Sequence, residues 1–136
     1  MAQRTKPSMK QPQNRSTVGY TFGFRRDQLD RIDAQSILLG NFSRYCKILL
    51  ECDEANPKRL EAWVKAQGKG WDDGALQSYH RHASIPIASK SYMQARIKTL
   101  GLNGILYLRR LVDMDTVENI AIAHLEKQAG QKLMPN

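Results

Sequence analysis

The chain has 136 residues, of which 41% are hydrophobic and 25% are charged, with a formal net charge of +8 at pH 7. This length corresponds to about one small domain, and the composition is typical of a soluble globular protein. The sequence has no apolar run of the roughly 20 residues needed to span a bilayer and no stretch resembling a signal peptide, so we expect a cytoplasmic protein without membrane contact.

The N-terminal arm, residues 1–17, is rich in Gln, Ser, Lys and Pro and has almost nothing apolar to bury, which predicts disorder. A positive protein with a basic arm attracts polyanions. Nucleic acid is the commonest polyanion, but anionic lipid or an acidic protein partner would also qualify. The arm contains no acidic residue, and its cations are Arg4, Lys6, Lys10 and Arg15.

From Val18 the pattern changes, because the aromatic residues of segment 20–24 alternate with small residues. This period of two predicts a short, half-buried strand. A helix is then expected to open at Asp27 and to end at Gly40. Its buried face is predicted to consist of Leu29, Ile32, Ser36 and Leu39.

Two more helices complete a first unit, residues 18–68. Ser43 is predicted to be the N-cap of a helix from Arg44 to about Asp53. Pro57 suits the first turn of a third helix, which is expected to stop near Gly68. The residues expected to be buried are Tyr45, Ile48, Leu49, Cys52, Leu60, Trp63 and Val64.

A glycine-containing linker, residues 69–81, precedes a second unit, residues 82–130, and one helical turn is expected at 75–80. Ile85 and Ile87 predict a second strand, although Pro86 lacks an amide donor. Ser89 is predicted to cap a helix that runs to about Leu100, followed by a turn at 101–104. Two helices should follow before a polar tail, residues 131–136. The first should carry Ile105, Leu108, Leu111 and Val112, and the second should carry Val117, Ile120, Ala121 and Leu125 and end before Gly130.

The two units contain related segments 62 residues apart, since residues 44–53 lie over residues 106–115. The matching positions are a tyrosine, a cation two residues later, an apolar pair, and an acid on either side of a small or soft residue. The register continues downstream, where Leu60, Trp63 and Gly68 meet Ile122, Leu125 and Gly130. The chain is therefore interpreted as one unit built twice. Repeats of about fifty residues would bury little core alone, so we expect them to pack together.

The order of strand, helix, glycine-containing turn and second helix resembles the ribbon-helix-helix family of Arc and MetJ. The second copy, residues 84–112, has a shorter first helix and a Gly-Leu-Asn-Gly turn. The resemblance covers roughly residues 18–128. In the first copy it is carried by Tyr20, Phe22, Phe24, Leu29, Ile32, Gly40, Ser43, Arg44 and Ile48.

The resemblance implies a mainly α fold with a short two-stranded antiparallel β-ribbon. Ordinary members are dimers, because a lone strand has unpaired amides on both edges. Here the second copy would supply the partner strand, giving a monomer that acts as a tandem pseudo-dimer, each copy followed by an extra helix. This is similar to TraY-type conjugation accessory proteins and to the T-DNA-transfer enhancer of the Agrobacterium virC operon.

In that family, outward ribbon side chains reach base edges, and the start of the second helix holds phosphates. The outward positions carried onto this chain are residues 19, 21, 23 and 25 and residues 82, 84 and 86, and the glycines and proline among them make base readout thin. Alternatively, Arg25 and Arg26 are a solvated helix start and Ser43 is a plain cap. The candidate DNA-binding residues are Thr21, Arg25, Arg26, Ser43, Arg44, Arg81, His82, Ser84 and Lys90, with Arg4, Lys6, Lys10 and Arg15 of the arm.

Other reactive residues have structural interpretations. Cys46 and Cys52 are expected to be reduced core thiols. Tyr45 and Tyr107 are interpreted as core tyrosines paired across the pseudo-twofold interface. The cations Lys47, Arg109 and Arg110 are expected at the surface or at the core edge.

Enzyme chemistry is not expected. The three histidines, His80, His82 and His124, have no metal-ligand spacing with either cysteine, and no Walker-type glycine loop occurs. The acidic pair at 72–73 is more simply a turn former. We therefore expect no catalytic residue, metal or cofactor.

The resulting hypothesis is a double-stranded DNA-binding protein that inserts a β-ribbon in the major groove, and unlike strands predict a non-palindromic site. The architecture implies an accessory factor of the relaxosome or T-DNA-processing type in conjugative transfer. A relaxase or another transfer or secretion protein would be a partner of such an accessory factor. One alternative is a transcriptional repressor of a plasmid or mobile element. Another alternative is a protein-interaction adapter that docks a secretion or partition component through Trp63, Trp71 and the third helices.

Overall fold

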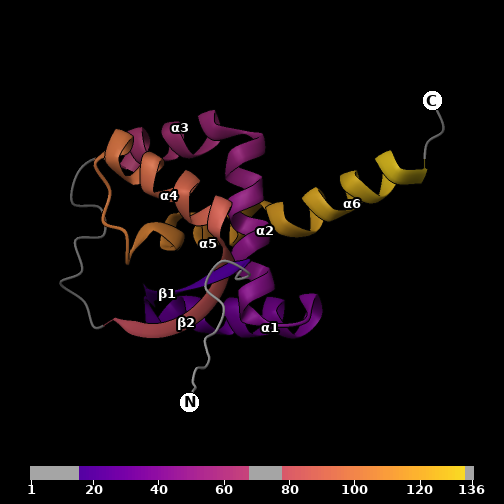
Figure 1. Ribbon diagram of the computed structural model, residues 1–136, viewed down its shortest axis with the longest axis horizontal. Helices are drawn as coiled ribbons and strands as arrows, with labels where there is room; N and C mark the ends of the chain where they lie inside the picture. The colour runs from indigo at the N-terminus through magenta and orange to yellow at the C-terminus, as the bar shows by residue number, and fades with distance from the viewer. Residues whose placement is uncertain (1–15, 68–77, 134–136) are drawn as a thin grey trace, which may run out of the picture.

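The computed structural model describes residues 16–67 and 78–133, which form a mainly helical fold with one two-stranded antiparallel sheet (Figure 1). Residues 1–15 of the predicted arm, the glycine loop with Trp71, and residues 134–136 lie outside this range. The predicted end of the arm is wrong, because its last residue, Thr17, begins the first strand. In chain order the elements are β1 (Thr17–Phe24), the 3-10 turn η2 (Arg26–Gln28), α1 (Leu29–Leu39), α2 (Phe42–Ala55), α3 (Pro57–Gln67), β2 (Tyr79–Pro86), α4 (Ile87–Leu100), α5 (Tyr107–Glu118) and α6 (Ile120–Leu133).

The ribbon joins strands that are far apart in the sequence. β1 pairs with β2 so that Thr17 lies opposite Pro86 and Phe24 opposite Tyr79. The alternation predicted for β1 is confirmed, because Phe22 and Phe24 are buried and Tyr20 is partly buried. The helical turn predicted up to His80 is wrong at its end, since Tyr79 and His80 are the first residues of β2.

The connection between α1 and α2 depends on two neighbouring residues. Gly40 has φ 119° and ends α1 as predicted, because a side chain there would be strained. Asn41 is the N-cap of α2, and its Oδ1 accepts a 2.8 Å hydrogen bond from the amide of Arg44. The prediction that Ser43 caps this helix is wrong, because Ser43 already lies in the first turn.

The second half differs from the sequence expectation at several helix boundaries. α4 begins at Ile87, directly after Pro86, so Ile87 is not in the strand and Ser89 is not a cap. Ile105, predicted to belong to the second helix of this half, precedes α5 and is exposed. Val117 belongs to α5 and is 71% exposed, and α6 runs through Gly130 and extends away from the body of the molecule (Figure 1).

The core lies between the inner face of the ribbon and helices α2 and α5, the second helices of the two predicted units. α2 lies at the centre of the fold (Figure 1). α2 packs against α1, β2 and α6, while α5 packs against β1. The burial predicted for α2 is confirmed at Tyr45, Ile48, Leu49 and Cys52. Arg109, predicted as a core-edge cation, is instead fully buried.

Candidate nucleic-acid interface

The outer face of the ribbon is polar and open to solvent. Exposed positions alternate with residues that face the helices, as the pleat of a strand requires. They are Thr17, Gly19 and Thr21 in β1 and His80, His82 and Ser84 in β2. This face therefore presents side chains that can donate or accept hydrogen bonds, and the opposite face belongs to the core.

Thr21 and His82 lie directly opposite each other near the middle of the ribbon. The hydroxyl of Thr21 is 3.1 Å from Nδ1 of His82. The imidazole extends over Gly19, where an added Cβ would come within 2.8 Å of Nε2. The lack of a side chain at Gly19 thus leaves space for the ring of His82 to lie along the strand.

Most of the polar groups on this face come from β2. Ser84 lies opposite Gly19, and His80 lies opposite Gly23. Gly23, predicted to face outward, is buried: its amide donates to the carbonyl of Ile105 at 2.9 Å, and its own carbonyl accepts from Nε of Arg109 at 2.9 Å.

The starts of the two second helices lie against the outer edges of the ribbon. At the edge of β2, Oγ of Ser43 accepts a 2.9 Å hydrogen bond from the amide of Ser84. At the edge of β1, Ile105 accepts from Gly23 just before α5 begins. These contacts satisfy amides that an open strand edge would leave unpaired. They also bring exposed Arg44, in the first turn of α2, to the flank of the ribbon.

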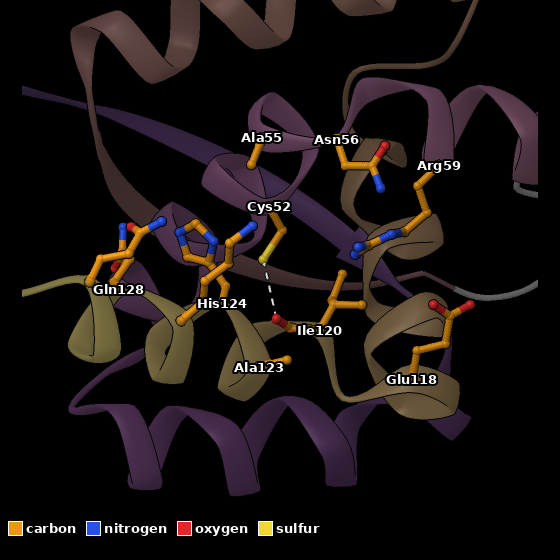
Figure 2. Close-up of a pocket in the computed structure, with 11 residues that line it drawn as sticks. Cys52, Ala55, Asn56, Arg59, Glu118, Ile120, Ala123, His124 and Gln128 are labelled. Atoms are coloured by element: carbon orange, nitrogen blue, oxygen red, sulfur yellow. Dashed lines mark hydrogen bonds between the residues drawn. The ribbon is translucent and has the colours of Figure 1, made fainter. Parts of the chain in front are cut away.

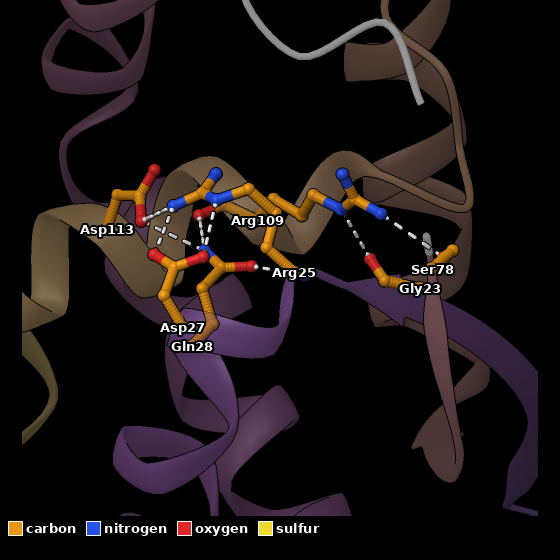
Figure 3. Close-up of polar contacts among 7 residues, drawn as sticks. All are labelled: Gly23, Arg25, Asp27, Gln28, Ser78, Arg109 and Asp113. Carbon is orange, nitrogen blue, oxygen red and sulfur yellow. Dashed lines mark hydrogen bonds and ion pairs between the residues drawn. The ribbon is translucent and has the colours of Figure 1, made fainter. Parts of the chain in front are cut away.

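Arg25, one of the predicted DNA contacts, is bound by two carboxylates (Figure 3). Its guanidinium donates to Asp27 at 3.0 Å and to Asp113 of α5 at 2.7 Å, and its side chain is only 18% exposed. The hydrogen bond from Arg25 is the main cause that lowers the pKa of Asp27. Gln28 joins the cluster by donating to Asp113 at 2.9 Å. Arg25 therefore links the end of β1 to α5, and two acids offset its charge.

The remaining predicted cations are placed differently from one another. Arg26 is exposed, with its guanidinium 6.0 Å from the centre of the Tyr79 ring. Arg81 alternates with the outward residues and donates to the carbonyl of His80 at 3.2 Å. Lys90 lies in the first turn of α4, directly after β2. The four cations of the arm lie outside the described residues.

Two buried aspartates connect the halves of the chain. Asp115 of α5 accepts from Tyr45 of α2 at 2.7 Å, and Arg31 and Gln35 of α1 each donate to it at 3.1 Å. Burial, reinforced by Asp115, raises the pKa of Tyr45 far above its usual range, so the hydroxyl stays protonated and donates.

The second aspartate has the converse partners. Asp53 of α2 accepts from Tyr107 of α5 at 2.6 Å and from Arg96 and Tyr92 of α4, each at 3.0 Å. Burial, followed by Asp53, likewise raises the pKa of Tyr107. The expectation that Tyr45 and Tyr107 pair with each other is corrected, because each hydroxyl bonds the aspartate of the other half.

Sequence reasoning missed His80 and the acceptor Asp113. His80 was assigned to a helical turn, but strand alternation continued back from Ala83 would have placed it on the outer face. Asp113 contacts residues more than eighty positions away, and no local pattern signals such a contact.

Comparison of the chain with protein-family models, with curated proteins and with solved structures finds no match. Within residues 16–67 and 78–133, no helix is long and apolar enough to cross a bilayer. The same residues contain no group of three or more His, Cys, Asp or Glu side chains placed to hold a metal ion.

Proposed function

We propose that this chain binds double-stranded DNA by inserting the β1–β2 ribbon into the major groove, as a tandem ribbon-helix-helix protein. The observation that carries the proposal is the ribbon itself, which has one polar face in solvent and is flanked by the starts of α2 and α5. A two-stranded ribbon fits the width of the major groove. Helix starts on either side suit phosphates, because their amides point outward.

The tandem organisation is supported by the crossed aspartate contacts. The bond from Tyr45 to Asp115 and the bond from Tyr107 to Asp53 exchange when the sequence is shifted by 62 residues. The arginines are not related by this shift, but they show the same crossing, since the first helix of each half, α1 or α4, supplies one to the aspartate of the other half. Such reciprocity is expected of two equivalent units related by a twofold axis.

The sequence offset that relates equivalent residues of the two halves is 62 in the second helices and 61 in the ribbon. A shift of 62 would match Tyr20, which faces the core, with His82, which faces solvent. A shift of 61 matches Thr21 with His82, the pair directly opposed in the ribbon. A twofold axis through this pair relates core-facing residues of β1 to core-facing residues of β2, and solvent-facing residues to solvent-facing ones, because side chains alternate with period two.

The ribbon's outer face suggests an asymmetric target. In the ribbon alignment, Gly19 takes the place of His80, and Gly23 takes the place of Ser84. Base-edge contacts from side chains would therefore come mainly from β2, with Thr17 and Thr21 as the contribution of β1. Unequal strands favour a non-palindromic site.

The salt dependence of duplex binding tests the phosphate contacts. Fluorescence anisotropy with a labelled duplex should show binding that weakens steeply as salt rises. Arg44→Ala should lower the slope of log affinity against log salt by about 0.9, the value for one lost phosphate. Lys65→Ala is the matched control, because Lys65 is an exposed cation of α3, a helix that lies away from the ribbon (Figure 1).

Two results would refute the proposal. One is the absence of binding to any duplex at low salt, which would favour the adapter. The other is an equal change in slope for Arg44→Ala and Lys65→Ala, since binding would then be spread over the whole surface. Selection from a random duplex library tests the readout: His82→Ala should change the preferred sequence while leaving the salt slope within about 0.5 of wild type.

An accessory role in conjugative or T-DNA-like transfer remains the setting that the tandem architecture suggests. A repressor of a plasmid or mobile element would use the same ribbon. Footprinting separates them, because the accessory factor protects a transfer origin and the repressor protects a promoter.

A further inference from the structure

A cavity of about 490 Å³ lies at the end of α2 that is remote from the ribbon. Its walls come from the end of α2, the start of α3 and the inner side of α6 (Figure 2). Ser43, at the other end of α2, contacts the ribbon. The volume is in the range of small-molecule sites, about 300–1,000 Å³. None of the proposed DNA contacts lines it.

Arg59 gives this cavity its chemical character. It is partly buried, and within the described residues its guanidinium has no hydrogen-bond or ion-pair partner. Arg31 and Arg96, by contrast, each bind a buried carboxylate. A guanidinium presents a planar fork of donors that matches a carboxylate or phosphate, and an unpaired fork in a cavity favours such an anion.

Among the described lining residues, cations outnumber carboxylates by two to one. Lys127 of α6 adds a second cation, and Glu118 supplies the one carboxylate among the lining residues. His124 is held by Glu51, with 3.3 Å between Nε2 and Oε1. Asn56, Gln128 and Gln131 add amide groups that can donate to further oxygens of a bound molecule.

The remaining wall is apolar and unreactive. It consists of Ala55, Ile120, Ala123 and the thiol of Cys52, which donates to the carbonyl of Ile120 at 3.5 Å. Burial raises the pKa of Cys52 to about 12, so the thiol stays protonated and adds no competing negative charge. This wall suits the hydrocarbon body of a ligand whose charged end faces Arg59.

We propose that this cavity binds a small organic anion, with its carboxylate or phosphate on Arg59 and its apolar body against Ala55, Ile120 and Ala123. An occupant would bridge α6 to the corner between α2 and α3. The site is separate from the ribbon and does not depend on duplex binding.

The test is an amide NMR titration of the full chain with benzoate, phenyl phosphate and inorganic phosphate, with benzyl alcohol as the neutral analogue. Benzoate or phenyl phosphate should cause saturable shifts at Ala55 and Ala123, with dissociation constants of about 1 mM, corresponding to about 4 kcal/mol of binding energy. The stronger of the two identifies the preferred head group. Inorganic phosphate should bind more weakly, because it lacks the apolar body.

Arg59→Gln should weaken binding at least tenfold, a loss of about 1.4 kcal/mol. Lys58→Gln is the matched control, since Lys58 is exposed on the same helix and does not line the cavity. The proposal is overturned if no anion gives saturable shifts up to about 20 mM, a concentration well above the expected constant. It is equally overturned if benzyl alcohol binds as well as benzoate, or if both variants weaken binding alike.

Discussion

The hydroxyl of Tyr107 donates a 2.6 Å hydrogen bond to Oδ2 of Asp53, joining the second helices of the two halves. The same carboxylate accepts from Nε of Arg96, whose side chain is only 10% exposed. The contact is therefore part of a buried charge cluster and stabilises the packing of one half on the other.

Removal of the carboxylate should be far more damaging than removal of the tyrosine hydroxyl. Asp53→Ala should lower the free energy of unfolding by about 3–5 kcal/mol, because Arg96 keeps its buried charge without its main partner. Tyr107→Phe should cost about 1–2 kcal/mol, since Asp53 retains its other donors. Urea unfolding followed by circular dichroism measures both.

Glu61→Gln is the control for this pair. Glu61 also accepts from Arg96, but its side chain is 46% exposed, so its loss should change the free energy of unfolding by less than about 0.5 kcal/mol. Equal effects of Asp53→Ala and Glu61→Gln would mean that the buried cluster contributes no more than a surface ion pair. If Asp53→Ala does not fold, Tyr107→Phe still provides the comparison.

Stability should fall at alkaline pH. Burial raises the pKa of Tyr45 and Tyr107 in the folded protein. In the unfolded chain, the tyrosines have their ordinary pKa of about 10. Their contribution is complete below about pH 10 and is lost as pH rises further, because only the unfolded state releases these protons readily. Each tyrosine should steepen the loss by about 1.4 kcal/mol per pH unit.

Urea unfolding midpoints at pH 8, 9.5 and 10.5 test this expectation. Tyr45→Phe should make the free energy of unfolding fall less steeply with pH above about pH 10, by about 1.4 kcal/mol per pH unit, which corresponds to one proton. The chain has five tyrosines, and tyrosinate absorbance reports their ionisation directly. Titration of all five near pH 10 while the protein remains folded would contradict the expected retention of protons by Tyr45 and Tyr107.

The two thiols should react only after unfolding. Cys46 is fully buried and Cys52 is 5% exposed, and burial raises the pKa of both, so little thiolate is present. Ellman's reagent should label neither thiol of the native protein within minutes and both in concentrated guanidinium chloride. Prompt labelling of one equivalent in the native protein would show that the cover over one of them opens readily.

The two ribbon glycines should tolerate alanine differently. At Gly23 a Cβ would overlap Oγ of Ser78 and lie 3.1 Å from Ile105, so Gly23→Ala should destabilise the fold by about 1–3 kcal/mol. At Gly19 the obstacle is the end of the His82 ring, which can rotate away. Gly19→Ala should therefore cost less than about 1 kcal/mol and should change the duplex sequence selected. Equal losses of stability would contradict this distinction.

Arg25→Ala tests whether Arg25 stabilises the fold or contacts a phosphate. Its guanidinium binds Asp27 and Asp113, so the variant should lose about 1–3 kcal/mol of stability with no change in the salt slope of duplex binding. Arg44→Ala should do the reverse. A lower salt slope for Arg25→Ala in a folded protein would restore Arg25 as a DNA contact.

Local sequence patterns predict an element correctly where its buried residues recur with a single strand or helix period. Tyr20, Phe22 and Phe24 predicted β1, and the apolar stripe of α2 predicted its buried face correctly. β2 was harder to place, because Arg81 falls on its inner face and makes the alternation resemble a polar loop. Local sequence therefore predicts the first strand correctly but misplaces the start of its partner, which begins at Tyr79.

Choices between nearby residues depended on tertiary contacts. Asn41 and Ser43 are both good N-caps, and the hydroxyl of Ser43 is used by the amide of Ser84, 41 residues away. The repeat marked Tyr45, Tyr107 and both aspartates as equivalent, but it did not indicate that the bonds cross between halves. Arg109 was misplaced because its acceptor, the carbonyl of Gly23, lies 86 residues away.

The crossed pairing also imposes an order on folding during translation. The polar side chains that satisfy Asp53, those of Tyr92, Arg96 and Tyr107, are all synthesised after the first three helices. In a nascent chain that ends before them, the carboxylate of Asp53 lacks the donors it needs in order to be buried, and β1 lacks its partner strand β2. We therefore expect the N-terminal half to complete its fold only after α5 has left the ribosome.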